Sequence, residues 1–372
     1  MYQRKSRRAG AAMVALSLCL RLCILLGLDA KAAALLSQAA QTPVFAQWML
    51  YLETGQVASV EQPEDTQVFV LQWEQPENDA EAEETAPQEA PEASEDVPSQ
   101  EAPASVPTET FQSAELPAVL ASADAIPIAG GCTYTVDKAA LLAQPSTLDF
   151  SVDGPTILIL HTHASEAYTP EPGWEYEESS AYRTLDLSRS VVAVGKALAE
   201  TLRRYGLEVI HDATVNDYPS YNDSYANALS RIEAWKAQYP SLQMVIDVHR
   251  DAVAGTDGQA YPLSATVNGA EVAQLMLVVG TDQGGLYHPN WRENLANALK
   301  LQSVLEGAYP GLCRNLNLRT ERFNQHATPG SILVEFGSNG NTLSQAIQSA
   351  ELLGQSIASM IEAISQNGGV LS

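Results

Sequence analysis

The strongest constraint on the fold of this chain is residues 32–137, which contain 19 Asp and Glu and no Lys or Arg. From Glu53 to about Ala125 this stretch is rich in Glu, Pro, Ala, Ser and Gln. Proline denies the backbone regular hydrogen bonding and like charges repel, so such a segment cannot bury enough apolar surface to offset its chain entropy. We therefore expect residues 32–129 to form a disordered acidic linker and residues 130–372 to form the folded domain.

The charge of the chain excludes one class of partner. The formal net charge is 20 − 45 = −25, and the acidic stretch supplies −19 of it, which leaves −6 for all other residues. No basic stripe is present to neutralise phosphates, so nucleic-acid binding is excluded. The hydrophobic content of 45% still suffices for one substantial core.

Residues 1–31 predict a membrane segment. Four basic residues within Arg4–Arg8 precede the apolar run Ala9–Leu28, which only Arg21 interrupts. At about 1.5 Å per residue this run spans ~30 Å, the thickness of a hydrocarbon core, and the basic flank favours a cytoplasmic N-terminus. A cleaved signal peptide is the alternative, because Ala30-Lys31-Ala32 suits a signal peptidase. Both interpretations place the folded domain outside the cytoplasm, and we expect a single-pass protein of the cell membrane.

Strand and helix signals alternate after residue 130. Apolar runs predict strands at 156–160, 207–211, 243–248, 264–267, 275–279 and 331–335, and helical spacing predicts helices at 188–205, 221–238, 291–306 and 343–364. Asn268-Gly269 favours a hairpin turn between the strands at 264–267 and 275–279. The pattern predicts an α/β fold with a mostly parallel sheet, in which ligands bind beyond the carboxyl ends of the strands.

Groups that can bind a metal follow three of the predicted strands. His163 and Glu166 lie just after the first strand with the spacing His-x-x-Glu, and His249 ends the third strand. Two nitrogens and one carboxylate leave a fourth tetrahedral position open for water, which is typical of catalytic rather than structural zinc. Taken singly, a His at a strand end is more often a polar cap, but the coincidence of three such strand ends favours a metal hydrolase.

Two further acidic residues complete the predicted site. Glu335 closes the strand at 332–334 and is free to act as general base on a metal-activated water and later as acid to the leaving amine. Asp247 lies two residues before His249 on the same face of its strand, so it is a candidate hydrogen-bond acceptor behind that ligand.

Neutral and basic residues near these positions are candidate substrate contacts. Arg250 offers a bidentate guanidinium to a peptide carboxylate, with an ion pair to Asp251 as the structural alternative. Asn324, Gln325 and Asn339 carry amides suited to a peptide backbone or an N-acetyl group.

The cysteines carry no metal-binding pattern. Cys132 and Cys313 are far apart in the sequence, and either one disulfide or two free thiols is compatible with it.

Four motifs resemble, in order, those of the stage II sporulation protein P family. They are His161-Thr-His-Ala-Ser-Glu166-Ala-Tyr168, Asp247-Val-His-Arg-Asp251, Phe323-Asn-Gln-His326 and Leu333-Val-Glu-Phe-Gly-Ser-Asn-Gly-Asn-Thr342. The resemblance runs from about residue 155 to 364. It implies a three-layer sandwich with a central mixed, mostly parallel sheet, preceded by a membrane segment and a variable spacer.

The resemblance also implies an activity. Members of the family are similar to zinc-dependent N-acetylmuramoyl-L-alanine amidases, which remove stem peptides from peptidoglycan, with an accompanying endopeptidase activity. The implied role is engulfment of the forespore, with stage II sporulation proteins D and M as partners and Zn²⁺ as cofactor. A zinc carboxypeptidase or endopeptidase that acts on peptides only, or a non-catalytic wall-binding module, are the alternatives.

The resemblance leaves two ligand positions open. It puts the metal on His163 or His161 and on His249, with Glu335 as the catalytic carboxylate. Related amidases take their carboxylate ligand from the start of the following helix, where this chain has Asp186. We expect His163 and Glu166, because together they complete His-x-x-Glu.

Overall fold

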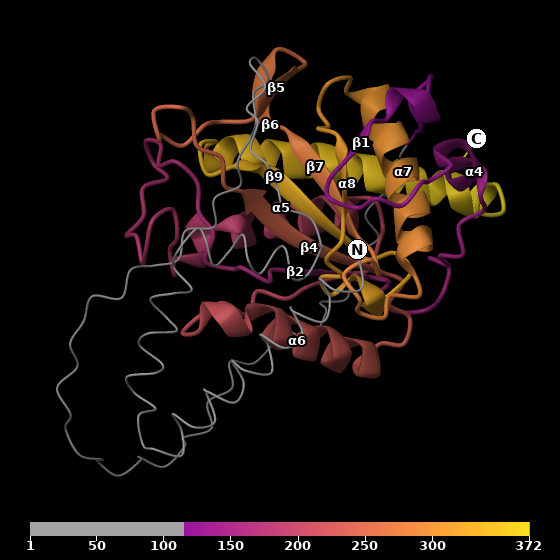
Figure 1. The fold of residues 1–372 in the computed structure, drawn as a ribbon, viewed down its shortest axis with the longest axis horizontal. Helices are drawn as coiled ribbons and strands as arrows, with labels where there is room; N and C mark the ends of the chain where they lie inside the picture. Colours follow the sequence, from indigo (N-terminus) through magenta and orange to yellow (C-terminus); the bar gives the residue numbers. More distant parts are fainter. Residues whose placement is uncertain (1–114, 372) are drawn as a thin grey trace, which may run out of the picture. The chain divides into compact units, whose positions relative to one another are not determined.

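The computed structural model describes residues 115–371 (Figure 1). The expected membrane segment and residues 32–114 of the expected linker lie outside the described residues. Between residues 115 and 371 no helix combines the length and the apolar character needed to cross a membrane.

The folded unit includes residues that we expected in the linker. A short 3₁₀ turn at Ala123–Ala125 is followed by strand β1 (Ile128–Ala129). Ile126 is fully buried, and the backbone N–H of Ala121 donates to the carbonyl of Ser303 at 3.1 Å. Residues 115–129 therefore pack on the domain, because their apolar side chains complete its core where the acidic composition ends.

A seven-stranded mixed sheet forms the centre of the domain. Its strand order is β1-β8-β7-β9-β4-β2-β3. The strands are β2 (Ile157–Leu160), β3 (Val209–His211), β4 (Met244–Asp251), β7 (Leu275–Gly280), β8 (Leu316–Arg319) and β9 (Ile332–Ser338), with β1 at one edge. All neighbours are parallel except β7 and β9, so β2, β3, β4 and β9 run one way and the other three run against them.

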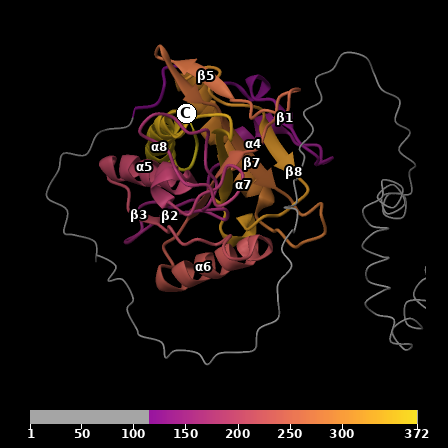
Figure 2. The ribbon, with the colours of Figure 1, turned by 90° about the vertical axis from the view of Figure 1, so that its left-hand side faces the viewer.

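Helices cover both faces of this sheet and make three layers (Figures 1 and 2). On one face lie α5 (Val191–Arg204), α7 (Trp291–Ala308) and α8 (Leu343–Gln366), which share the main core with Ile157, Ile159 and Ile246. On the other face α6 (Ser224–Gln238) packs Ala228 and Ile232 on Leu158, Leu160 and Val245. The predicted α/β three-layer sandwich with a mostly parallel sheet is confirmed.

Local sequence signals set the ends of the helices. The Ser190 hydroxyl accepts from the N–H of Val192 and caps α5, and Gly206 follows its end with a φ of +83°, which only glycine adopts without strain. Thr342 and Gln345 form a capping box at the start of α8. The chain therefore turns sharply from the end of β9 into α8.

Several elements differ from the sequence predictions. The Asn268-Gly269 turn is present, with both residues at positive φ, but it joins β5 (Ser264–Val267) to β6 (Ala270–Ala273). The predicted partner at 275–279 is instead β7 of the main sheet. The short helix α4 (Lys138–Ala143) and strands β1 and β8 have too few residues for a clear periodic signal.

Candidate metal centre

The topology brings the three predicted strand ends to one edge of the sheet. β2, β4 and β9 are neighbours and run in the same direction, so their carboxyl ends meet. His249 and Glu335 are direct cross-strand partners in the register of β4 and β9. Because side chains alternate along a strand, both residues share the α6 face with Val245 and Leu333.

The His-x-x-Glu turn after β2 places its two candidate ligands beside His249. The N–H of Glu166 donates to the carbonyl of His163 at 3.1 Å, which closes the turn. The rings of His163 and His249 lie with centroids 5.3 Å apart and nearly perpendicular. Oε2 of Glu166 lies 3.6 Å from Nδ1 of His249. The predicted set of His163, Glu166 and His249 is therefore close in space.

The alternative ligands lie elsewhere. His161 has the strand parity of Ile157 and Ile159, so its ring points to the α5 face, where Nδ1 lies 3.3 Å from the Val248 carbonyl and Nε2 lies 3.0 Å from Nε2 of His211. Asp186 is exposed and accepts from the N–H of Ser188 at 3.0 Å as the cap of a 3₁₀ turn.

Asp247 supports His249 from behind, at the position that the sequence predicts. Its Oδ1 lies 3.0 Å from Nε2 of His249 and accepts from the N–H of Thr162 at 2.8 Å. Its Oδ2 accepts from the Thr162 hydroxyl at 2.6 Å. The bonds to Thr162 fix the Asp247 carboxylate on the Nε2 side of the His249 ring, so Nδ1 of His249 faces Glu166.

The charges of the site follow from its burial and its carboxylates. Burial lowers the pKa of His163 to about 3, so this imidazole is neutral. Burial alone would also lower the pKa of His249, but Asp247, Glu166 and Glu335 outweigh it and raise that pKa to about 10. Burial and the nearby Asp251 carboxylate raise the pKa of Glu335 to about 8. The raised pKa keeps His249 protonated near pH 7, which adds a positive charge beside these carboxylates.

The chemistry of these residues fits a divalent cation. No three His, Cys, Asp or Glu side chains of residues 115–371 are already arranged as ligands. Three atoms of the site are nevertheless buried with no hydrogen-bond partner among the described residues, which is costly unless a ligand completes them: Nδ1 of His163, Nε2 of His249 and Oε2 of Glu335. A cation would also replace the proton on His249, as metal binding commonly does.

The four predicted substrate contacts are engaged by the backbone of the domain. Each of their side chains is hydrogen-bonded to the backbone of a loop or strand end, so the contacts that these side chains make are internal to the domain. The bonds are Arg250 to the carbonyls of Ala167 and Tyr182, Asn324 to the carbonyl of Tyr225, Gln325 to Val278 and Gly280, and Asn339 to the N–H of Val253.

Sequence reasoning missed three residues that line the site. The ring of Tyr221 stacks on His163, with centroids 4.5 Å apart and planes 7° apart, and the ring of Tyr225 meets the edge of His163 at 5.7 Å. Arg183 lies 3.7 Å from Glu166 and is paired with the buried Asp217 at 2.9 Å. The only available signal was the density of Tyr in 218–225, which marks no particular position.

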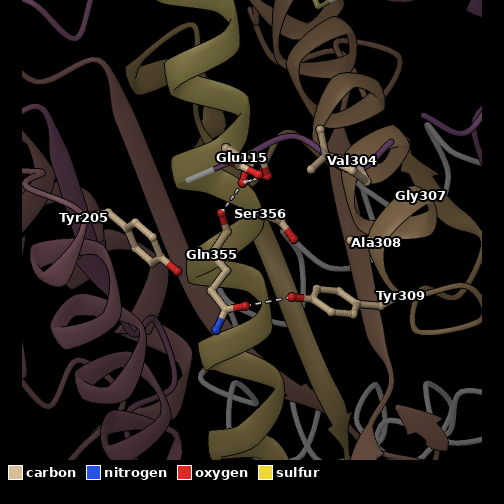
Figure 3. Close-up of a pocket in the computed structure, with 10 residues that line it drawn as sticks. Glu115, Tyr205, Val304, Gly307, Ala308, Tyr309, Gln355 and Ser356 are labelled. Carbon is tan, nitrogen blue, oxygen red and sulfur yellow. Dashed lines mark hydrogen bonds between the residues drawn. The ribbon is translucent and has the colours of Figure 1, made fainter. Parts of the chain in front are cut away.

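Other predicted features lie away from the site. Cys132 and Cys313 are both free thiols. His326 lies in the 3₁₀ turn at Gln325–Ala327, beside His288 and apart from His163 and His249, so the third family motif contributes no ligand. A pocket of about 350 Å³ between α7, α8 and residues 115–117 contains none of the predicted site residues (Figure 3).

The fold and the site together define an α/β sandwich with a candidate metal centre at the carboxyl ends of parallel strands. The chain belongs to the stage II sporulation protein P family, whose model matches residues 41–358. A search of the curated proteins found no match.

Solved structures similar to this chain include several amidases. N-acetylmuramoyl-L-alanine amidase AmiC2 of Nostoc punctiforme is 15% identical with a TM-score of 0.33, over 57% of this chain and 98% of that chain. The N-acetylmuramoyl-L-alanine amidase from Clostridium difficile 630 is 15% identical with a TM-score of 0.34, over 59% and 100%. The amidase Ami1 from Mycobacterium smegmatis is 11% identical with a TM-score of 0.33, over 56% and 98%.

Proposed function

We propose that this chain is a zinc-dependent peptidoglycan hydrolase of sporulation that cleaves the amide between muramic acid and L-alanine and releases stem peptides. The observation that carries the proposal is the meeting of His163, Glu166 and His249 beside a buried, unpartnered Glu335 oxygen. Membership of the stage II sporulation protein P family supports the same conclusion.

The chain's own residues divide the work. His163, Glu166 and His249 would hold Zn²⁺, which when bound lowers the pKa of water and polarises a carbonyl. Asp247 lies 3.0 Å from Nε2 of His249 and would orient that ring for binding. The Arg250 side chain donates to the carbonyl of Ala167, and the backbone N–H of Arg250 donates to Oε2 of Glu166, so both bonds hold the His-x-x-Glu turn in place.

Glu335 would transfer a proton from the attacking water to the leaving amine. Its position opposite His249 lets its carboxylate take a proton from the attacking water and return it to the leaving amine. The pKa of about 8 means that burial already favours the protonated state, and a nearby dication would bring that pKa down toward neutrality. An acid that can both accept and donate a proton near pH 7 suits this double role.

The proposal is tested by zinc content and by the products released from purified cell wall. We expect the full-length chain to bind zinc and to release free stem peptides. Glu335→Gln is expected to retain zinc and to lose release by a factor of about 10² to 10⁴, the usual contribution of a general base. Undiminished release by this variant would contradict the role of Glu335.

The same assay separates the alternatives. An enzyme that acts on peptides only would trim or open cross-links while the bond between sugar and peptide stays intact. A wall-binding module would contain no zinc and would release nothing. Endopeptidase activity beside the amidase activity would appear as shortened cross-linked products.

Location and partners are part of the proposal. The N-terminal segment would anchor the chain with its catalytic domain outside the cytoplasm, and stage II sporulation proteins D and M would act beside it. Co-purification of the full-length chain with these two proteins from sporulating membranes tests this, and its absence in crosslinked samples would count against the assembly.

A further inference from the structure

Arg183 is held beside the candidate metal centre by the backbone. Arg183 and Glu166 form an antiparallel bridge, and the N–H of Ala167 donates to the carbonyl of Tyr182 at 2.9 Å. The loop that follows the His-x-x-Glu turn therefore folds back along it. Arg183 is 17 positions from Glu166 in the sequence (183 − 166), but the bridge makes the two direct neighbours.

One side of the Arg183 guanidinium is fixed and the other is free. Nη1 donates to Oδ2 of Asp217 and to the Ser165 hydroxyl, each at 2.9 Å. Nη2 lies 3.7 Å from Oε1 of Glu166, which is too far for a hydrogen bond, and Nε makes none with any described residue. The side chain is 20% exposed. The result is a rigid cation with spare donors that solvent can reach.

Tyr221 forms a surface beside these donors. The carbon at the centre of the guanidinium lies 4.8 Å from the centroid of the Tyr221 ring, which also stacks on His163. Tyr221 is 40% exposed, so part of its ring faces solvent. Arg183 and Tyr221 therefore make a flat wall that leads from the solvent to a candidate ligand.

Three arginines lie among the carboxylates around the site, and their hydrogen-bond partners differ. Five carboxylates lie here against three arginines. One of the two arginines other than Arg183 donates through Nε and Nη2 to carbonyls, and the other donates through Nη1 to a carboxylate at 2.7 Å. The residues are Glu166, Asp217, Asp247, Asp251 and Glu335, with Arg183, Arg250 and Arg314. Of the three arginines, Arg183 is the one whose guanidinium lies over the partly exposed ring of Tyr221, so an anionic substrate that approaches along this ring meets Arg183.

We propose that Arg183, backed by Tyr221, binds a carboxylate of the peptide part of the substrate. This inference rests on the proposed function and specifies which substrates it favours. The spare guanidinium donors match a carboxylate, and their fixed position on Asp217 reduces the ordering cost of binding. Nη2 of Arg183 is 3.7 Å from Glu166, a candidate ligand of the metal at which the scissile bond would lie. Because an extended residue spans at most ~3.6 Å, the bound carboxylate lies within about two residues of that bond.

The test compares the affinities of two ligands for Glu335→Gln, a variant that is expected not to hydrolyse them. The ligands are a muramoyl dipeptide with a free terminal carboxylate and the same compound with a terminal carboxamide. Dissociation constants are measured on full-length, zinc-loaded Glu335→Gln. We expect the carboxylate to bind about 10- to 100-fold more tightly, the range for a charged hydrogen bond. Equal affinity for the two ligands would overturn the proposal without any further variant.

Substitution of Arg183 then tests whether this residue causes the preference for the carboxylate ligand. Adding Arg183→Gln to Glu335→Gln is expected to bring the ratio of the two dissociation constants to about 1, mainly by weakening the carboxylate ligand. An unchanged ratio, or an equal loss for both ligands, would mean that Arg183 only supports the loop. Arg189→Gln is the matched control, because Arg189 lies in the same loop and stacks on Trp174 at 4.9 Å.

Two precautions keep the outcomes distinct. If Arg183→Gln does not fold because Asp217 loses its partner, the pair Arg183→Gln with Asp217→Asn removes both charges together. Failure of the proposed function would appear as the absence of peptide release by the unsubstituted chain. Failure of the present inference would appear only in the ratio of the dissociation constants.

Discussion

Replacing Gly195 by Ala tests how rigidly the imidazoles beneath the candidate metal centre are held. Gly195 lies in α5, and a Cβ built there would be 2.5 Å from Cε1 and 2.6 Å from Nε2 of His161, and 3.1 Å from Nε2 of His211. Ordinary carbon contacts are about 3.5 to 4.0 Å. His161 cannot move aside freely, because its two ring nitrogens face the Val248 carbonyl and His211.

The expected sign follows from two opposing contributions. Alanine in the middle of a helix is more favourable than glycine by about 0.5 to 1 kcal/mol. Overpacking a rigid, buried site costs about 1 to 3 kcal/mol. We therefore expect Gly195→Ala to lower the free energy of unfolding, by up to about 2.5 kcal/mol.

The assay is urea unfolding of the full-length chain followed by circular dichroism. Ala197→Gly in the same helix is the matched control. Ala197 is only partly buried against the core, so this change measures mainly the helix contribution and is expected to cost at least about 0.5 to 1 kcal/mol. An increase in stability for Gly195→Ala, of the size that helix propensity alone gives, would refute the reasoning. It would show that the His161 and His211 rings have room to move.

Two other predictions concern the metal and the core. Zinc at 100-fold above its dissociation constant should raise the free energy of unfolding by about 2.7 kcal/mol, seen as a higher melting temperature, and His249→Ala should abolish that rise. A full rise in the variant would place the metal elsewhere. Burial lowers the pKa of Lys300 from 10.5 to about 8, so the unfolded chain holds this proton more tightly and stability should increase from pH 8 to 10.5. The difference in unfolding free energy between the unsubstituted chain and Lys300→Met should then grow by up to about 1.4 kcal/mol per pH unit in that window, and a flat difference would contradict the lowered pKa.

The part of the site that the sequence could predict is the part that strands carry. His163, His249 and Glu335 each follow or end an apolar run, and parallel strands bring their ends to one edge whatever the order of the sheet. His161 keeps the strand parity of Ile157 and Ile159, whereas His163 lies in the turn beyond the end of β2, so only the spacing His-x-x-Glu favours His163 over His161. These are local rules, so they can be applied before any long-range contact is known.

The remaining features depend on contacts that no local pattern encodes. Arg183 reaches the site because its loop forms a bridge to Glu166, and Tyr221 stacks on His163 because the turn before α6 ends there. Arg250 follows a candidate ligand in the sequence, yet its guanidinium is used by two carbonyls of the same loop. The direction of β7 likewise follows from pairing with β9, not from its own residues.

The reversal of β7 has a practical use. Because β7 runs against β9, the turn after β7 emerges at the edge opposite to His163 and His249. Leu286 and Tyr287 in that turn are 57% and 79% exposed. An affinity tag inserted between them would immobilise the protein through this turn and leave the edge that carries His163 and His249 facing away from the support.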